Sequence, residues 1–340
     1  MYRIGLVGAG GVGQKRAAAV AAHPECELAL VCDLDRAAAS SLAQRHGAAV
    51  VATWEELVVS PDLEMVVVST THEWLSPVSA AALRAGKHVL VEKPMGRNPG
   101  EARLIVEAAA TSGCCLKAGY NHRYHPAIAK LRQVCEAGAL GPLHFIRGRY
   151  GHGGRPGYER EWRADPARSG GGELLDQGAH LVDLSLWFLG DFERVSGELC
   201  TSFWPIAPLE DNAFGLFATA AGQVASLHVS WTQWKNLFSF EVFGRDGYAA
   251  AQGLGGSYGL EQAVVGRRAT EGGPPAEERF EFPGEDGSWR LEWDDFVRAV
   301  KTGSPPLAEG REALRTLEWI FRLYRAAREG RSVSAGEPST

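Results

Sequence analysis

A glycine-rich turn near the start of the chain constrains the fold more than any other feature. In YRIGLVGAGGVGQKRAAAVAAH, an apolar strand from Ile4 to Val7 leads into Gly8-Ala9-Gly10-Gly11-Val12-Gly13 and then into an alanine-rich helix. The first glycine of such a G-x-G-x-x-G turn permits the tight bend, the second lets the backbone approach a pyrophosphate, and the third lets helix and strand pack closely. The helix N-terminus also favours an anion. The turn therefore predicts dinucleotide binding at Gly8, Gly10, Gly11, Val12 and Gly13.

A second short strand, ELALVCDLD, completes a β-α-β unit and ends at Asp33, 20 residues after Gly13. A carboxylate at this place accepts hydrogen bonds from the ribose hydroxyls of NAD and repels the 2′-phosphate of NADP. Arg36 follows closely and could pair with that phosphate instead. We therefore predict NAD as the cofactor, with Asp33 and Arg36 beside it, and retain NADP as the alternative.

Strands and helices alternate as far as residue 120, which predicts a parallel sheet covered by helices on both faces. Beyond residue 140 the strands lengthen and alternate with period two, as in QVASLHVSW, which favours a mostly antiparallel sheet with unlike faces. Helical patterns cover 173–189, 290–302 and 310–329. At 340 residues the chain exceeds the roughly 250–300 residues at which single cores stop growing. We predict an α/β protein with a Rossmann domain (1–121), an α+β domain with an open sheet (122–332) and a flexible tail (333–340).

The charge balance argues against two classes of partner. Lys and Arg total 35 against 41 Asp and Glu, a net charge of −6, so the chain offers no basic footprint for nucleic acid or an anionic membrane. We find no leader-like segment and no apolar run near the roughly 20 residues that span a bilayer, which predicts a cytoplasmic protein. The six cysteines, including adjacent Cys114 and Cys115, lack C-x-x-C spacing and are predicted to be free thiols.

The stretch VLVEKP contains the first candidate for chemistry, Lys93. It lies at the carboxyl end of a predicted parallel strand, the edge at which open α/β sheets place their ligands. Because Pro94 follows, helical backbone geometry is unfavourable at Lys93. This restriction holds the Lys93 side chain at that edge. An exposed cation at a strand end is the alternative interpretation.

A second candidate lies in GGGELLDQGAHLVD, residues 170–183. Asp176 and His180 are four positions apart, so on one helix they project from the same face and could both contact one small molecule. The alternative is structural: Asp176 orients a buried histidine, and the three glycines only permit a turn into the helix.

Six segments together resemble the Gfo/Idh/MocA oxidoreductases from residue 2 to about 332: GLVGAGGVG, VCDLD, GKHVLVEKP, AGYNHRYHP, GGGELLDQGAHLVDLSLWFLGDF and EALRTLEWIFRLYRAAREGRSV. The resemblance implies a Rossmann domain, a second domain with an open antiparallel sheet, and oxidation or reduction of a sugar, an inositol-like cyclitol or a sugar derivative at a secondary alcohol. It places Lys93, Asp176 and His180 at the catalytic positions of the family. His180 would take the hydroxyl proton and Lys93 would stabilise the oxygen, across a crevice between the domains. Asp176 would bind a second hydroxyl or orient the imidazole.

Other segments supply weaker candidates. In VVVSTTHEWLSP the chain departs from many relatives, which carry proline and asparagine at the places of Thr71 and His72 and a histidine at that of Leu75. Cofactor contacts are nevertheless predicted for Thr70, Thr71, His72 and Glu92, with a surface-loop histidine as the alternative for His72. Substrate contacts are predicted for Asn121, Arg123, Arg155, Tyr158, Trp162 and Arg163. His122 and His125 have too few partner ligands for a metal, so no metal site is expected.

The antiparallel sheet also bears on assembly. Phe238, Phe240 and Val242 alternate along one strand, and an apolar sheet face needs cover, which predicts a homodimer or homotetramer through this sheet. Trp231 and Trp234, near a strand end, are interpreted as part of that face, or else as pocket walls.

Two other functions stay open. One is an NADP-dependent nucleotide-sugar ketoreductase, favoured by the loop arginines and opposed by Asp33. The other is a non-catalytic regulator that senses a dinucleotide, opposed by the joint presence of Lys93, Asp176 and His180.

Overall fold

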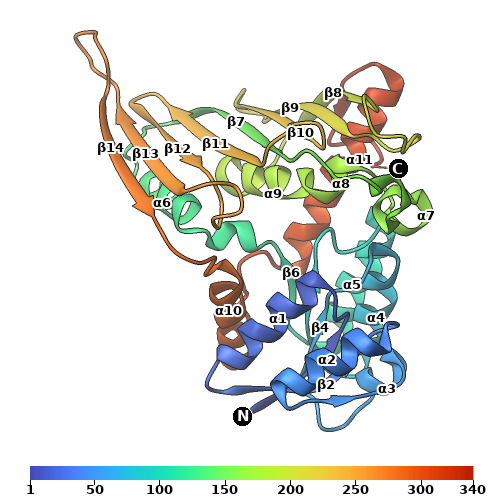
Figure 1. The fold of residues 1–340 in the computed structure, drawn as a ribbon. Helices are drawn as coiled ribbons and strands as arrows, with labels where there is room; N and C mark the ends of the chain where they lie inside the picture. Colours follow the sequence, from blue (N-terminus) through green and yellow to red (C-terminus); the bar gives the residue numbers. More distant parts are fainter. Residues whose placement is uncertain (340) are drawn as a thin grey trace. The chain divides into compact units, whose positions relative to one another are not determined.

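The computed structural model describes residues 1–339, which form two compact units (Figure 1). Unit 1 comprises Met1–Asn121, Ala167–Gly170 and Trp289–Leu317, and unit 2 comprises His122–Pro166, Gly171–Ser288 and the chain from Glu318 onward. The sequence placed 167–170 and 289–317 in the second domain, but they belong to unit 1. The apolar side of helix α10 (Ser288–Thr302) explains the second of these differences, because it packs into the core of unit 1. Thr340 lies outside the described residues.

Unit 1 contains a parallel sheet that, within residues 1–339, has six strands in the order β3-β2-β1-β4-β5-β6. Its strands are β1 (Tyr2–Val7), β2 (Cys26–Cys32), β3 (Ala49–Val50), β4 (Met65–Val68), β5 (His88–Glu92) and β6 (Leu116–Gly119). The central strands are apolar and buried throughout, as expected of a sheet covered on both faces. The strand order reverses between β1 and β4, and ligands of such sheets bind at the carboxyl ends beside this point.

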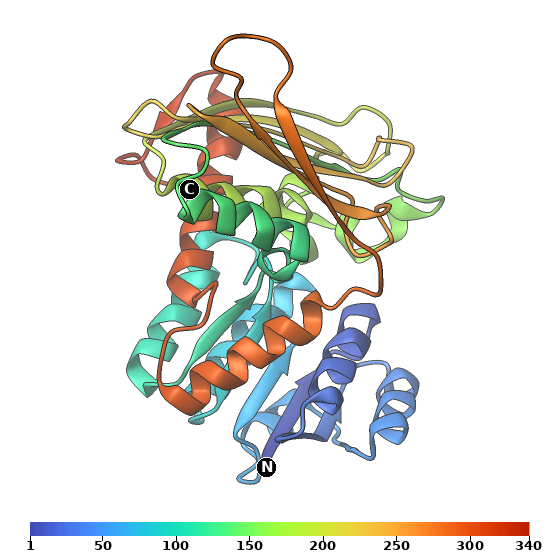
Figure 2. The same ribbon diagram turned by 90° about the vertical axis from the view of Figure 1, so that its left-hand side faces the viewer.

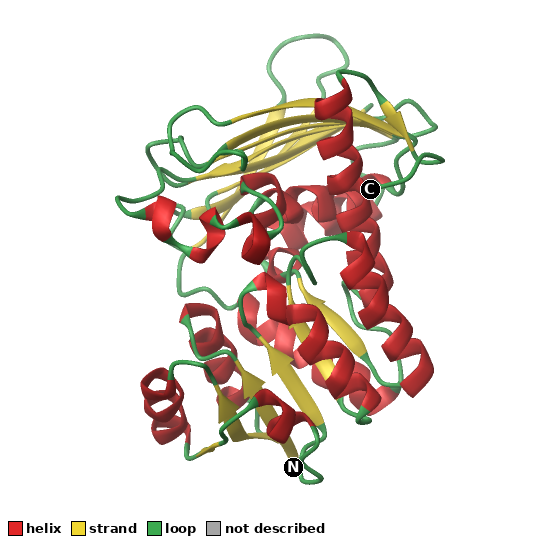
Figure 3. Ribbon diagram, turned by 90° about the vertical axis from the view of Figure 1, so that its right-hand side faces the viewer, coloured by secondary structure: helices red, strands yellow, loops and turns green. Residues whose placement is uncertain are grey.

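Helices cover both faces of the parallel sheet (Figures 2 and 3). They are α1 (Gly11–Ala22), α2 (Arg36–His46), α3 (Trp54–Val58), α4 (His72–Arg84), α5 (Pro99–Ser112) and α10 (Ser288–Thr302), with the short α7 (Pro166–Ser169). Trp293 and Phe296 of α10 join Ile4, Leu6 and Ala17 in one buried cluster. A helix from near the end of the chain therefore completes the N-terminal domain. None of the helices within residues 1–339 is both long and apolar enough to cross a membrane.

Unit 2 is built on a mixed sheet of nine strands within the described chain, in the order β14-β13-β12-β11-β7-β10-β9-β8-β15. The strands are β7 (Leu143–Gly151), β8 (Arg194–Cys200), β9 (Asn212–Ala218), β10 (Val224–Ser230), β11 (Leu237–Gly244), β12 (Gly247–Gln252), β13 (Glu261–Arg267), β14 (Ala276–Phe282) and β15 (Val333–Ser334). β7 and β10 are parallel, and the other neighbours are antiparallel. The mostly antiparallel sheet predicted from the sequence is confirmed.

One face of this sheet carries the helices of unit 2 (Figure 1). The helical elements of the unit are η1 (Asn121–Tyr124), whose first residue belongs to unit 1, α6 (Pro126–Glu136), η2 (Tyr158–Arg160), η3 (Trp162–Ala164), α8 (Glu173–Asp176), α9 (Gly178–Leu189) and the last part of α11 (Gly310–Glu329). Phe240 packs against Phe188 of α9, with ring centroids 5.5 Å apart. Phe238 and Val242 are buried as well. The prediction that these three residues need a partner subunit was therefore wrong, because α6 and α9 already cover their face.

The opposite face of the sheet exposes a different set of apolar side chains. Phe214 is 45% exposed and Leu216 52%, and both project from β9. Phe145 of β7 is 38% exposed and stacks on Phe243 of β11 at 4.6 Å. Trp231, in contrast, is fully buried beneath the loop that contains Trp204. The sequence pattern correctly predicted that the two faces of the sheet differ. The apolar residues predicted for the exposed face were the wrong ones.

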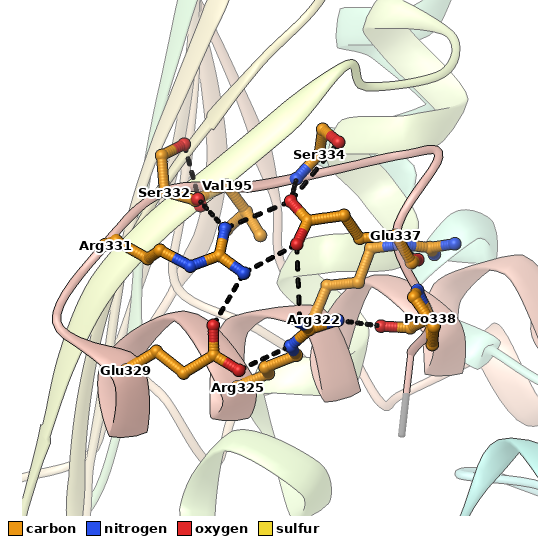
Figure 4. A network of polar contacts seen from close by, with 9 residues as sticks. All are labelled: Val195, Arg322, Arg325, Glu329, Arg331, Ser332, Ser334, Glu337 and Pro338. Carbon is orange, nitrogen blue, oxygen red and sulfur yellow. Dashed lines mark hydrogen bonds and ion pairs between the residues drawn. The ribbon is translucent and has the colours of Figure 1, made fainter.

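The C-terminal segment is held against the end of α11 (Figure 4). Val333 and Ser334 form β15, which pairs with the edge strand β8. Arg331 lies 2.6 Å from Glu337, and Arg325 donates to the carbonyl of Pro338 at 3.2 Å. The sequence predicted a flexible tail from residue 333, whereas residues 333–338 make these contacts. Polar composition alone did not reveal the arginines of α11 that hold the segment.

Candidate active site

The glycine turn of unit 1 has the geometry expected of a pyrophosphate-binding loop. Gly8 has φ 101°, and a Cβ there would collide with the backbone of Ser69, while a Cβ on Gly13 would collide with the carbonyl of Gly8. Within the described chain, a Cβ added to Gly10 or Gly11 would meet no atom within 4 Å. The first and third glycines thus allow close packing, and the second leaves open space where the backbone can approach an anion at the start of α1.

Asp33 braces this turn from the end of β2. Its Oδ2 accepts the N–H of Ala9 at 2.6 Å, and its Oδ1 accepts the N–H of Asp35 at 2.7 Å. Asp35 in turn caps α2 by accepting the N–H groups of Ala37 and Ala38. Arg36 is the first residue of α2 and is exposed. The structure therefore brings Asp33 to the glycine turn, at the carboxyl edge of the sheet.

His72 does not lie in a surface loop, which was the alternative considered from the sequence. It is the first residue of α4 and is buried, with Nδ1 2.7 Å from the carbonyl oxygen of Ser169. The next residue, Glu73, accepts a hydrogen bond from Arg168 at 2.8 Å. The segment 167–170, distant in sequence but part of unit 1, buries this imidazole, which local sequence could not show. Thr70 and Thr71 lead directly into α4, and the Oγ1 of Thr70 donates to the carbonyl of Thr71.

Lys93 follows β5 at the same carboxyl edge and is partly exposed. The residue before it, Glu92, accepts a hydrogen bond from Arg16 of α1 at 2.6 Å, and Arg16 donates to Glu292 of α10 at 2.6 Å. Burial opposes the charge on Arg16, but the two carboxylates outweigh it and raise its pKa. A Cβ on Gly119 would collide with the Arg16–Glu92 pair. A buried ionic triad, Arg16–Glu92–Glu292, therefore fixes the end of β5, a role the sequence did not predict for Glu92.

In unit 2 the predicted helix 173–189 is interrupted at Gln177, between α8 and α9. The N–H of His180 donates to the carbonyl of Gln177 at 3.0 Å. Glu210 anchors the start of α8 by accepting the N–H groups of Gly172 and Leu174 and the hydroxyl of Tyr324. Burial raises the pKa of Glu210 although these donors oppose the rise. A Cβ on Gly172 would collide with Glu210, so this glycine permits the close approach.

The imidazole of His180 is buried and stacked on that of His122. The two ring centroids are 3.6 Å apart, and the planes differ by 18°. The ring centroid of His122 is also 5.5 Å from that of His125, whose Nδ1 lies 2.9 Å from Oε2 of Glu261. The ring centroids of Tyr150 and His180 are 6.2 Å apart. The sequence considered His122 only as a metal ligand, and its position three residues before His125 gave no sign of this stack.

Asp176 is paired rather than isolated. Its Oδ2 accepts a hydrogen bond from Nε of Arg163 at 2.9 Å. Burial works to lower the pKa of Arg163, but Asp176 and Tyr158 raise it overall. The guanidinium also lies 4.5 Å from the ring of Trp162. Arg163 and Trp162, predicted as substrate contacts, are thus brought to Asp176 within unit 2.

Three other predicted substrate contacts have different surroundings. Tyr158 is buried against Trp231 and Trp204, and burial raises its pKa far above the usual range. Arg123 forms a buried two-bond pair with Asp183, at 2.9 and 2.7 Å. Arg155 is exposed and pairs with Glu161 at 2.6 Å. These contacts serve packing or charge balance inside unit 2 and weaken the assignment of all three residues to the substrate. Asn121 is buried at the end of unit 1.

Comparison with known protein families places both units. The family described as an oxidoreductase family with an NAD-binding Rossmann fold matches residues 2–120, and the GFO/IDH/MocA C-terminal domain matches residues 128–250. The two matches together cover most of the chain and identify an NAD(P)-dependent oxidoreductase. The chain belongs to the Gfo/Idh/MocA family.

Individual relatives agree with this assignment. The 1,5-anhydro-D-fructose reductase of Ensifer adhaerens is 28% identical over 98% of both chains. The levoglucosan dehydrogenase of Pseudarthrobacter phenanthrenivorans is 27% identical over 64% of this chain and 59% of its own length. The crystal structure of GenD2 from gentamicin A biosynthesis, in complex with NAD, is 28% identical, with a TM-score of 0.86 over 99% of this chain and 97% of its own. These relatives are a reductase, a dehydrogenase and an NAD-bound protein.

Proposed function

We propose that this chain oxidises or reduces a secondary alcohol or ketone of a sugar, an inositol-like cyclitol or a sugar derivative, with NAD as cofactor. The observation that carries the proposal is the buried imidazole of His180, held by the stack with His122 one turn beyond Asp176. A neutral imidazole is the usual proton acceptor near neutral pH. Two of the relatives named above, a 1,5-anhydro-D-fructose reductase and a levoglucosan dehydrogenase, support this substrate class.

The residues of unit 1 suit the cofactor. The turn from Gly8 to Gly13 would hold the pyrophosphate, and Asp33 would meet the ribose while still bracing Ala9. A carboxylate at this place disfavours a 2′-phosphate, which supports NAD over NADP. When bound, the nicotinamide supplies the hydride acceptor or donor. Thr70, Thr71 and His72 are proposed to contact the cofactor from the start of α4.

Side chains of the protein must accept the hydroxyl proton and stabilise the reacting oxygen. In the oxidative direction the carbinol carbon loses a hydride and its hydroxyl loses a proton, so that a ketone forms. We assign that proton to His180. Lys93 is proposed to donate a hydrogen bond to the reacting oxygen and to stabilise its developing negative charge. Asp176, neutralised by Arg163, would orient a neighbouring hydroxyl.

The two alternatives fit less well. A nucleotide-sugar substrate would need free arginines for its phosphates, but Arg155 pairs with Glu161, and Arg163 with Asp176. A regulator that only senses dinucleotide has no need of a lysine at the end of β5 and a buried imidazole held by a stack. The dehydrogenase is therefore the function that these residues support best.

The deciding experiment is a spectrophotometric screen of sugars, inositols, aminocyclitols and nucleotide sugars with NAD and NADP. We expect NAD reduction with at least one polyol, and His180→Ala and Lys93→Ala to lower kcat by about two to four powers of ten while NADH still binds. Near-normal kcat in both variants would defeat the residue assignment. Tight dinucleotide binding without turnover on any compound would favour the regulator.

We further propose that the chain is a homodimer or homotetramer through the open face of the second sheet. Phe145, Phe214 and Leu216 expose apolar surface there, and Arg147, two residues after Phe145 on β7, pairs with Glu241 of β11 at 2.6 Å. A monomer by light scattering at micromolar concentration would contradict this. All six cysteines are free thiols, which fits the cytoplasm as the site of action.

A further inference from the structure

Gln177 occupies the joint between α8 and α9, directly after Asp176. Its carbonyl accepts the N–H of His180, and its own N–H donates to the carbonyl of Glu173, both at 3.0 Å. Residues three apart in such a turn lie on the same side. The amide side chain of Gln177 therefore starts from the same side of the backbone as the imidazole proposed to be the base.

A contact from a distant loop fixes the orientation of that amide. Nε2 of Gln177 donates to the hydroxyl oxygen of Tyr258 at 3.1 Å. Tyr258 also receives a hydrogen bond from Tyr150, and their rings are 5.2 Å apart. Tyr150 is buried and lies next to both His122 and His180. Tyr258, itself held by Tyr150, thus fixes the nitrogen end of the Gln177 amide, so the other end of the amide is its oxygen, Oε1.

The oxygen end is the unusual part. Oε1 of Gln177 is buried and has no hydrogen-bond donor among residues 1–339. An amide oxygen can only accept hydrogen bonds, and leaving a buried acceptor without a donor is unfavourable. Asp176 beside it already accepts from Arg163, so Gln177 presents a fixed, neutral acceptor next to a neutralised carboxylate.

We propose that Gln177 Oε1 accepts a hydrogen bond from a substrate hydroxyl that neighbours the reacting one, and that Gln177 is a specificity-determining residue. This inference rests on the proposed oxidoreductase function. A neutral acceptor suits a hydroxyl, whereas an ammonium group would gain more from a carboxylate. The substrate class is therefore a polyol with at least two adjacent hydroxyls, one oxidised and one held by Gln177.

The test compares Gln177→Met with the wild-type enzyme. Methionine has a similar volume but neither polar atom. Both enzymes are assayed with the polyol of highest kcat/KM in the screen and with each of its monodeoxy analogues. For one analogue, we expect the wild type to lose at least tenfold in kcat/KM. Gln177→Met should lose a similar factor on the parent polyol and then distinguish the two compounds by less than about twofold.

Two further measurements make each outcome decisive. Unchanged NADH affinity in Gln177→Met, measured by fluorescence, shows that the variant is folded, and Tyr258→Phe should reproduce part of the loss because it releases the amide nitrogen. If Gln177→Met discriminates among all analogues as the wild type does, the inference fails while the proposed function stands. If the wild type neither oxidises nor binds any polyol, the proposed function fails and this inference fails with it.

Discussion

The imidazoles of His122 and His180 lie face to face, with centroids 3.6 Å apart, although 58 residues separate them in the chain. His122 comes from η1 and His180 from α9, so the stack joins the segment that opens unit 2 to the proposed catalytic turn. The stack therefore fixes the plane of the His180 imidazole.

The first prediction concerns this stack. His122→Ala should lower kcat about 10- to 100-fold, because a small misplacement of a catalytic group can cost two powers of ten, while the affinity for NADH stays unchanged. His122→Phe retains a flat ring and should stay within about threefold of the wild-type kcat. Steady-state kinetics of the two variants on one polyol decide the matter. Equal losses in both would show that the imidazole itself, rather than its stacking, is required.

The second prediction concerns cofactor choice. Asp33→Asn keeps an oxygen for the N–H of Ala9 but removes the negative charge that would face a 2′-phosphate. We expect the ratio of kcat/KM for NADP to that for NAD to rise about tenfold or more. Asp35→Asn is the matched control, because it retains the cap of α2 and should leave the ratio unchanged. A wild-type preference for NADP would overturn the assignment of Asp33.

The third prediction concerns stability. Arg16→Met leaves Glu92 and Glu292 buried together without their cation, and breaking a buried pair in this way costs about 3–5 kcal/mol. Lys15→Met, on the same helix but exposed, should change the free energy of unfolding by less than about 1 kcal/mol. Urea denaturation of both variants measures the difference. Similar unfolding midpoints would mean that the triad contributes little.

The fourth prediction concerns pH. The hydrogen bond from Arg331 lowers the pKa of Glu337 from 4.5 to about 2. Because the folded-state pKa is depressed, the contribution of this contact is complete above pH 4.5 and is lost as the pH falls toward 2. An NMR titration of the Glu337 carboxyl carbon should show its midpoint near 2, and Arg331→Gln should move it toward 4.5. A wild-type midpoint near 4.5 would show that the contact does not persist in solution.

The fifth prediction concerns the cysteines. Burial raises the pKa values of Cys26, Cys115 and Cys135 to about 11, so their thiolate fractions at pH 8 are very small. Cys200 is exposed and should react first with Ellman's reagent. Cys200→Ala should remove the fast phase. Labelling of the half-buried Cys115 as fast as that of Cys200 in the native protein would contradict this prediction.

The sequence predicted those parts of the molecule that local pattern controls. The glycine turn and the two kinds of sheet follow from short-range spacing and periodicity. Contacts between distant segments were not accessible in this way. Arg16 meets Glu292 across 276 residues, and the interruption of the helix at Gln177 coincides with a hydrogen bond that the Gln177 amide donates to a tyrosine 81 residues away. The open sheet face was misassigned for a similar reason, because alternation shows that two faces differ but not which one the helices cover.

The pairing of β15 with β8 has a consequence for the behaviour of shortened forms of the chain. β8 would otherwise be the outermost strand on its side of the sheet, with backbone groups able to join a strand from another molecule. Residues 333 and 334 occupy part of that rim, and Arg322 and Arg325 of α11 hold the residues that follow them, Ala335 and Pro338. Removing the last nine residues would therefore uncover a template for strand addition, and self-association into aggregates would be the hazard to monitor.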